Sequence, residues 1–89
     1  MTTLHILITG SVQGVFYRLS AKKKAIQTGI TGWVKNTPEG NVEIIACGPI
    51  IQLREFVEWC EKGPAKARVD KVITEDTTAQ IFTEFKILH

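Results

Sequence analysis

Glycine and proline divide this chain into short segments whose apolar residues follow either the two-residue repeat of a strand or the roughly 3.6-residue repeat of a helix. The clearest helical signal spans residues 50–62, and a Gly-Pro pair on either side of it predicts its two ends. Its apolar residues at helical spacing are Leu53, Phe56, Val57 and Cys60. A chain organised in this way folds as short strands and helices joined by tight turns.

The strand-like segments are distributed along the whole chain. Residues 4–9 carry apolar side chains on both faces, which is typical of a central strand. Residues 32–36 and 41–47 predict a hairpin around a turn that contains proline and glycine. A further strand is expected near residues 68–76, and a short final strand around residues 83–88.

A first helix is expected from about residue 17 to residue 28, ending at Gly29, because glycine accepts the left-handed conformation that closes many helices. Two faces of this helix compete for the core. We expect the small-residue face to pack on the sheet, and it consists of Ala21, Ala25 and Thr28. The opposite face carries Leu19 and Ile26.

The resulting order is β-α-β-β-α-β with a short added strand at the C-terminus, the pattern of the ferredoxin-like split βαβ sandwich. We therefore predict an α+β fold in which an antiparallel sheet carries both helices on one face, with residues 1–89 forming a single domain. The compact length favours a free-standing protein over a part of a larger enzyme. This architecture hosts enzymes, metal carriers and nucleic-acid binders alike, so function must come from the site.

The composition limits the kinds of binding partner that this protein is expected to have. The net charge is +2, from 11 basic and 9 acidic residues, whereas a dedicated nucleic-acid binder carries a concentrated basic face. The two cysteines have no metal-binding spacing and are expected to be buried, reduced thiols. No segment has the length and apolarity of a membrane span or signal peptide. We expect a cytoplasmic, monomeric protein without metal or cofactor, whose partner is a small molecule rather than nucleic acid or membrane.

The segment from Gly10 to Arg18 is the best candidate for chemistry. It leaves a strand, passes two glycines and enters a helix, so its backbone N–H groups can surround a phosphate at the positive end of the helix. Arg18 stands in the first helical turn, where a guanidinium can add two parallel hydrogen bonds to phosphate oxygens. On spacing alone, an ordinary loop followed by a surface arginine is the slightly stronger interpretation.

Asn36 is the second candidate, because it ends the first hairpin strand at the edge of a rigid scaffold. Its amide offers both a donor and an acceptor and can orient a water molecule. Asparagine beside proline and glycine is also ordinary turn chemistry, and taken alone that reading is the stronger one. A catalytic triad is not indicated, since His5 and His89 have no Ser or Cys at a recognisable spacing. Paired catalytic carboxylates are not indicated either, because the acidic residues are scattered along the chain.

Two segments resemble the acylphosphatase family. GSVQGVFYR is similar to its active-site motif, in which glycine and V-Q-G-V precede an aromatic residue and arginine. GWVKNTPEGNVEIIACG is similar to its second motif, and the two occur in the expected order and separation. The resemblance covers residues 4–88 and is closest to bacterial members. One departure is Tyr17, where the family usually has phenylalanine; its hydroxyl needs a hydrogen-bond partner if it is buried.

The resemblance implies that the protein hydrolyses the carboxyl–phosphate bond of acyl phosphates without a metal. In that case Arg18 and the backbone N–H groups of residues 11–18 bind the phosphate, and Asn36 orients the attacking water. The residues of this backbone cradle are Ser11, Val12, Gln13, Gly14, Val15, Phe16 and Tyr17. The alternative is a non-catalytic phosphate- or nucleic-acid-binding module on the same fold. RNA-binding relatives of that fold display paired aromatics on exposed strands, whereas Trp33 stands alone in the predicted central strands.

Overall fold

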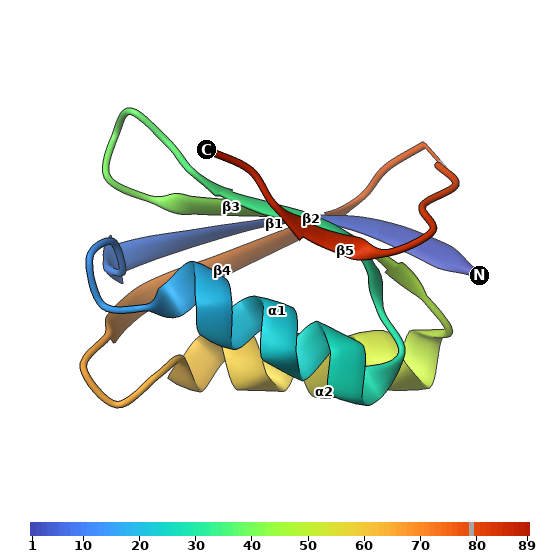
Figure 1. Ribbon diagram of the computed structural model, residues 1–89, viewed down its shortest axis with the longest axis horizontal. Helices are drawn as coiled ribbons and strands as arrows, with labels where there is room; N and C mark the ends of the chain where they lie inside the picture. Colours follow the sequence, from blue (N-terminus) through green and yellow to red (C-terminus); the bar gives the residue numbers. More distant parts are fainter. Residues whose placement is uncertain (79) are drawn as a thin grey trace.

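The computed structural model describes residues 1–78 and 80–89, which form a five-stranded sheet with two helices on one face (Figure 1). The chain order confirms the predicted pattern of strands and helices. The elements are β1 (Thr2–Ser11), α1 (Tyr17–Thr28), β2 (Thr31–Asn36), β3 (Val42–Gly48), α2 (Ile50–Lys62), β4 (Arg68–Asp76) and β5 (Phe85–Ile87). Both helices and β4 have the predicted bounds. β1 is longer than expected at both ends, and β5 is shorter.

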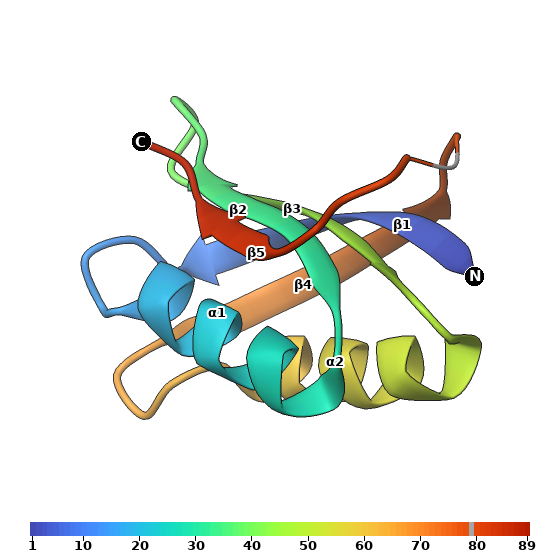
Figure 2. The ribbon, with the colours of Figure 1, turned by 45° about the vertical axis from the view of Figure 1, so that its right-hand side comes forward.

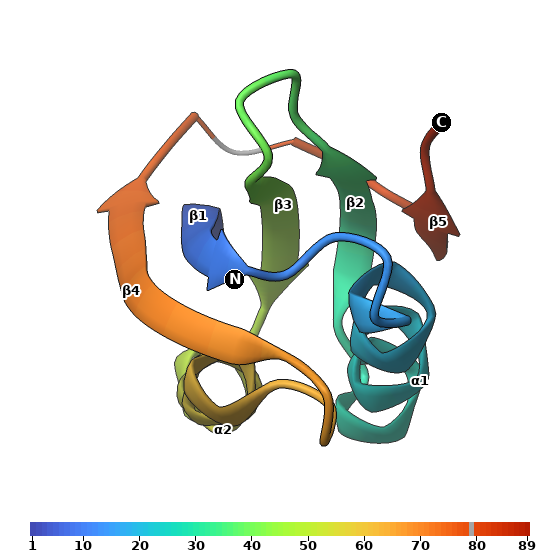
Figure 3. The same cartoon turned by 90° about the vertical axis from the view of Figure 1, so that its left-hand side faces the viewer.

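The strands lie in the order β4-β1-β3-β2-β5, so β1 is an interior strand as predicted (Figure 3). The four longer strands pair antiparallel. β5 instead pairs parallel with β2, with Phe85 opposite Gly32, so the complete sheet is mixed. The sequence pattern of a three-residue strand does not indicate whether it pairs parallel or antiparallel. That direction depends on how the chain passes from β4, at one edge of the sheet, to β5 at the other edge.

Both helices lie on the same face of the sheet (Figure 2), and they bury different kinds of side chain. α1 turns its small stripe inward, as predicted, and leaves Leu19 45% and Ile26 64% exposed. Small side chains let a helix approach the sheet closely, so the larger apolar residues of α1 remain outside. α2 buries its periodic residues Leu53, Phe56 and Cys60.

One end of the molecule brings together four segments that are distant in the sequence: the end of β1, the start of α1, the β2–β3 turn and the C-terminus (Figure 1). The pairing of β1 with β4 shifts register between Thr9 and Gly10, which is a β-bulge. Gly10 has φ of 130°, and a Cβ there would overlap the Arg68 carbonyl oxygen. The bulge bends the strand where the chain leaves the sheet towards α1.

Candidate active site

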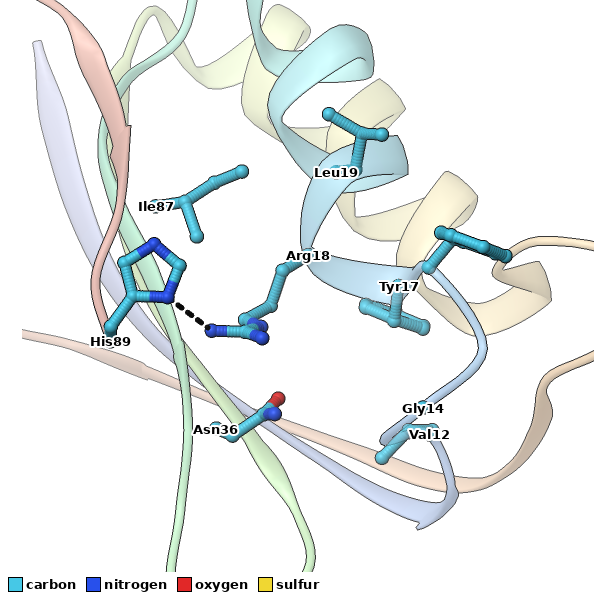
Figure 4. A pocket seen from close by; sticks show the side chains of 9 residues that line it. Val12, Gly14, Tyr17, Arg18, Leu19, Asn36, Ile87 and His89 are labelled. Carbon is cyan, nitrogen blue, oxygen red and sulfur yellow. Dashed lines mark hydrogen bonds between the residues drawn. The ribbon is translucent and has the colours of Figure 1, made fainter.

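A cavity of about 320 Å³ opens at this end of the molecule (Figure 4). Pockets for small ligands run from about 300 to 1,000 Å³, so this one suits a small molecule. Its lining residues come from the β1–α1 loop, α1, the end of β2 and the C-terminal segment, and they are Val12, Gly14, Phe16, Tyr17, Arg18, Leu19, Asn36, Ile87 and His89. The two predicted catalytic side chains therefore share one cavity.

The backbone of the loop between β1 and α1 is unusual both in its conformation and in its hydrogen bonding. Gly14 and Phe16 have positive φ, at 74° and 64°, and Phe16 is the only non-glycine residue with positive φ in the described part of the chain. Within residues 1–78 and 80–89, the backbone N–H groups of residues 12–16 donate to no protein acceptor. Because these donors lie beside the positive end of α1, the loop is able to bind an anion.

Arg18 reaches from the first turn of α1 across the cavity towards the C-terminal segment (Figure 4). Its Nη1 donates to the Leu88 carbonyl oxygen at 3.2 Å and lies 3.4 Å from the His89 Nδ1. The Leu88 N–H in turn donates to the Val34 carbonyl oxygen at 2.8 Å, so β2 holds the segment that contacts Arg18. Two contacts on one nitrogen leave the other guanidinium nitrogen atoms available for a ligand.

Asn36 is the last residue of β2, and Figure 4 shows its amide facing the guanidinium of Arg18. The loop and the hairpin are connected through Gln13. Its Nε2 donates to the carbonyl oxygens of Thr37 and Asn41, at 2.9 and 2.8 Å. These bonds hold the β1–α1 loop against the turn that follows Asn36, and so they fix the position of Asn36 relative to the loop.

The remaining predicted cradle residues do not line the cavity with their side chains. Ser11 closes β1 and is exposed, while Val15 packs against the core. The sequence predicts Arg18 and Asn36 as site residues, and both line the cavity, but it does not place Leu19, Ile87 or His89 there. The sequence predicts Leu19 on the face of the helix opposite the core, and Ile87 and His89 lie in the final segment. The only sequence signal for Leu19 is its position one residue after Arg18.

Tyr17 is buried, lines the cavity and connects the start of α1 to α2. Its hydroxyl donates to the Cys60 carbonyl oxygen at 2.6 Å, which supplies the partner that tyrosine requires in place of phenylalanine. Its ring lies 5.3 Å from that of Trp59. Burial raises the pKa of the Tyr17 phenol far above its usual range, so this hydroxyl remains protonated.

In the part of the chain that the structure describes, no group of three His, Cys, Asp or Glu side chains is placed to hold a metal ion. The helices seen there are all too short or too polar to cross a membrane. Both cysteines are free and buried, as expected. The fold and the cavity together define an α+β protein in which a guanidinium, a carboxamide and a loop with free backbone donors surround a cavity of small-molecule size.

Comparison with known proteins identifies the family. The family model described as Acylphosphatase matches residues 4–87. A Marinobacter nauticus acylphosphatase is 49% identical over 86 residues, which are 96% of this chain and 94% of the relative. Two solved acylphosphatase structures have the same fold. The one from Coxiella burnetii has a TM-score of 0.95 at 39% identity, covering 98% of this chain and 92% of that chain. The one from Bacillus subtilis has a TM-score of 0.97 at 32% identity, covering both chains completely. The chain belongs to the acylphosphatase family.

Proposed function

We propose that Arg18, Asn36 and the β1–α1 loop catalyse the hydrolysis of acyl phosphates to a carboxylate and inorganic phosphate. Membership of the acylphosphatase family makes the protein a hydrolase of this class. The assignment of residues rests on one observation: Arg18 and Asn36 line the same cavity as a loop whose backbone N–H groups find no acceptor among residues 1–78 and 80–89. Together these groups can bind a tetrahedral anion and place a water molecule beside it.

The phosphate group would lie against the N–H groups of residues 11–18 and the guanidinium of Arg18. Phosphoryl transfer spreads negative charge over the transferred oxygens, and catalysis depends mainly on positioning and on stabilising that charge. Fixed backbone dipoles and a guanidinium supply such stabilisation without having to reorganise during the reaction. Arg18 therefore contributes both to binding and to the transition state.

Asn36 would orient the attacking water through its amide. The new bond forms between the water oxygen and phosphorus, and the bond from phosphorus to the acyl oxygen breaks. A carboxylate is a good leaving group and needs no strong acid. The proton of the water passes to an oxygen of the substrate phosphate, because an amide does not accept it. The chemistry thus needs no titrating protein group.

The setting we propose is a monomer in the cytoplasm that acts on a small metabolite. Two buried, free thiols support the choice of a reducing compartment. Size-exclusion chromatography with light scattering tests the monomer.

The test is hydrolysis of acetyl phosphate in the presence of EDTA, with inorganic phosphate as a competitive inhibitor. Arg18→Gln should lose about 10²–10³ in rate and bind phosphate more weakly. Asn36→Ala should lower kcat and leave the inhibition constant of phosphate nearly unchanged. Arg54→Gln is the control for charge, since Arg54 is exposed on α2 outside the cavity lining. Equal loss of phosphate affinity in the Arg18 and Asn36 variants would contradict this division of roles.

A further inference from the structure

We propose that a second cavity, on the face of the sheet away from the helices, binds a free nucleotide that carries an aromatic base and a phosphate group. The cavity has a volume of about 320 Å³, and its walls include Trp33, Ile81, Phe82, Glu84 and Lys86. It shares no lining residue with the catalytic cavity. The hydrolysis of acyl phosphates uses none of these side chains, so this proposal goes beyond the proposed function.

The cavity lies where β2 and β5 meet the segment that leads into β5. Successive side chains of a strand point to opposite faces of a sheet, and Val34 is buried in the core. Trp33 therefore points to the face without helices, where it stands opposite Lys86 of β5. Figure 2 shows the chain approaching β5 on the side of the sheet away from the helices. Ile81 and Phe82 of this approaching segment complete the cavity.

The strand β5 separates the second cavity from the catalytic one. Ile87 and His89 line the catalytic cavity, whereas Lys86 and Leu88 line the second. This alternation is the two-residue repeat of an extended strand, whose neighbouring side chains point to opposite faces. A ligand in the second cavity therefore contacts β5 from the side that the catalytic groups do not occupy.

Two aromatic rings from separate segments line the second cavity. Trp33 and Phe82 are both partly exposed, and neither belongs to the hydrophobic core. Ile81 beside them is 97% exposed. Accessible aromatic side chains provide a stacking surface for a flat ring, and every nucleobase has one. The sequence shows Trp33 alone in the central strands, and only the fold brings Phe82 to the same cavity.

The charged side chains indicate what the ring must carry. Within residues 1–78 and 80–89, Lys86 forms no ion pair, whereas Lys35 is 3.6 Å from a carboxylate oxygen of Glu43. The Lys86 ammonium is therefore available to a phosphate group. Glu84 lines the same cavity, and its carboxylate can accept a hydrogen bond from an amino group such as that of adenine. A nucleotide with an amino group on its base offers a partner to both charges.

The size and charge of the cavity favour a free nucleotide over a nucleic-acid strand. Surfaces that bind a strand carry several cations that follow its phosphates. Among the lining residues that the structure describes, Lys86 is the only cation. Pockets for small ligands run from about 300 to 1,000 Å³, and this cavity stands at the lower end of that range. One base with its phosphate is the ligand that we expect.

The experiment titrates the protein with AMP and follows the quenching of tryptophan fluorescence. The chain has two tryptophans, so Trp59→Phe leaves Trp33 as the only reporter. Isothermal titration calorimetry on the wild type measures the same affinity independently of that variant. Phe82→Ala should weaken AMP binding at least about 5-fold, the lower end of the loss for one stacked base. Lys86→Gln should weaken it about 2- to 5-fold, because exposed charge pairs contribute modestly, and should leave adenosine binding unchanged.

Three controls locate the nucleotide. Lys71→Gln is the matched control for charge, because Lys71 is exposed on β4 at the opposite edge of the sheet, and it should leave AMP binding unchanged. Ribose 5-phosphate lacks the base and should bind more weakly than AMP. Arg18→Gln, in the catalytic cavity, should keep the wild-type affinity for AMP.

The proposal is wrong if AMP does not bind to the wild type. It is also wrong if Arg18→Gln abolishes binding and Lys86→Gln does not, because the nucleotide then lies in the catalytic cavity. A single-stranded oligonucleotide that binds more tightly per nucleotide than AMP would overturn the choice of a free nucleotide. None of these measurements uses hydrolysis of an acyl phosphate, so the proposed function is tested separately.

Discussion

Gln13 offers the sharpest test of how the site is assembled, because its side chain joins the β1–α1 loop to the hairpin that carries Asn36. Replacement by methionine keeps the length and much of the volume of the side chain and removes both N–H donors. The two hydrogen bonds to the carbonyl oxygens of Thr37 and Asn41 are then lost. Stability and turnover should both fall, for separate reasons.

The size of the stability loss depends on whether the carbonyl oxygens of Thr37 and Asn41 keep other hydrogen bonds. A hydrogen bond contributes about 0.5–1.5 kcal/mol net, so two bonds set a range of about 1–3 kcal/mol. Both carbonyls keep a second donor in the variant, since the Gly40 N–H donates to Thr37 at 3.1 Å and the Thr37 N–H donates to Asn41 at 2.9 Å. Because neither oxygen is left without a hydrogen-bond donor, we expect the free energy of unfolding to fall by about 1–2 kcal/mol.

Urea unfolding followed by tryptophan fluorescence measures this loss. With a slope of about 1 kcal/mol per molar urea for a protein this small, the midpoint should fall by about 1–2 M. Turnover of acetyl phosphate should fall about 10-fold, because small displacements of positioning groups are costly. Gln52→Met is the matched control: Gln52 is exposed on α2, and its replacement should change stability by less than about 0.5 kcal/mol. A Gln13→Met variant with wild-type midpoint and turnover would refute the reasoning.

Three further outcomes are expected. Tyr17→Phe removes the hydroxyl that donates to the Cys60 carbonyl and should cost about 1–3 kcal/mol in urea unfolding, because that acceptor is buried; an unchanged midpoint would show that the bond contributes nothing. Gly10→Ala should unfold the protein or destabilise it by more than about 4 kcal/mol, since its Cβ would overlap backbone at the bulge; a folded variant with a wild-type melting temperature would contradict this. Burial raises the pKa of Cys60 from 9.0 to about 12, and it raises that of Tyr17 as well, so both neutral forms favour the folded state. Their contribution to stability is complete below about pH 8 and is lost as pH rises from 9.0 towards about 12, which urea titrations at alkaline pH can follow.

The local pattern of apolar, glycine and proline residues was enough to predict most of the secondary structure. The bounds of both helices and of β4 follow from periodicity and from the glycine and proline residues beside them, because these signals act over a few residues. The choice of the small-residue face of α1 also follows from the sequence, since side-chain size limits how closely a helix can approach a sheet. The two motifs were enough to name Arg18 and Asn36 as candidates.

Only the tertiary structure decided what surrounds those two residues. Arg18 contacts His89, which is 71 positions away in the sequence, and Gln13 reaches across 24 positions to Thr37. The parallel pairing of β5 with β2 brings Ile87 and His89 to the cavity, and it also determines which residues stand beside Leu19. Periodicity reports the face on which a side chain lies, whereas contacts of this kind depend on how elements distant in the sequence are placed in space. The surroundings of Arg18 and Asn36 were therefore visible only once the chain was folded.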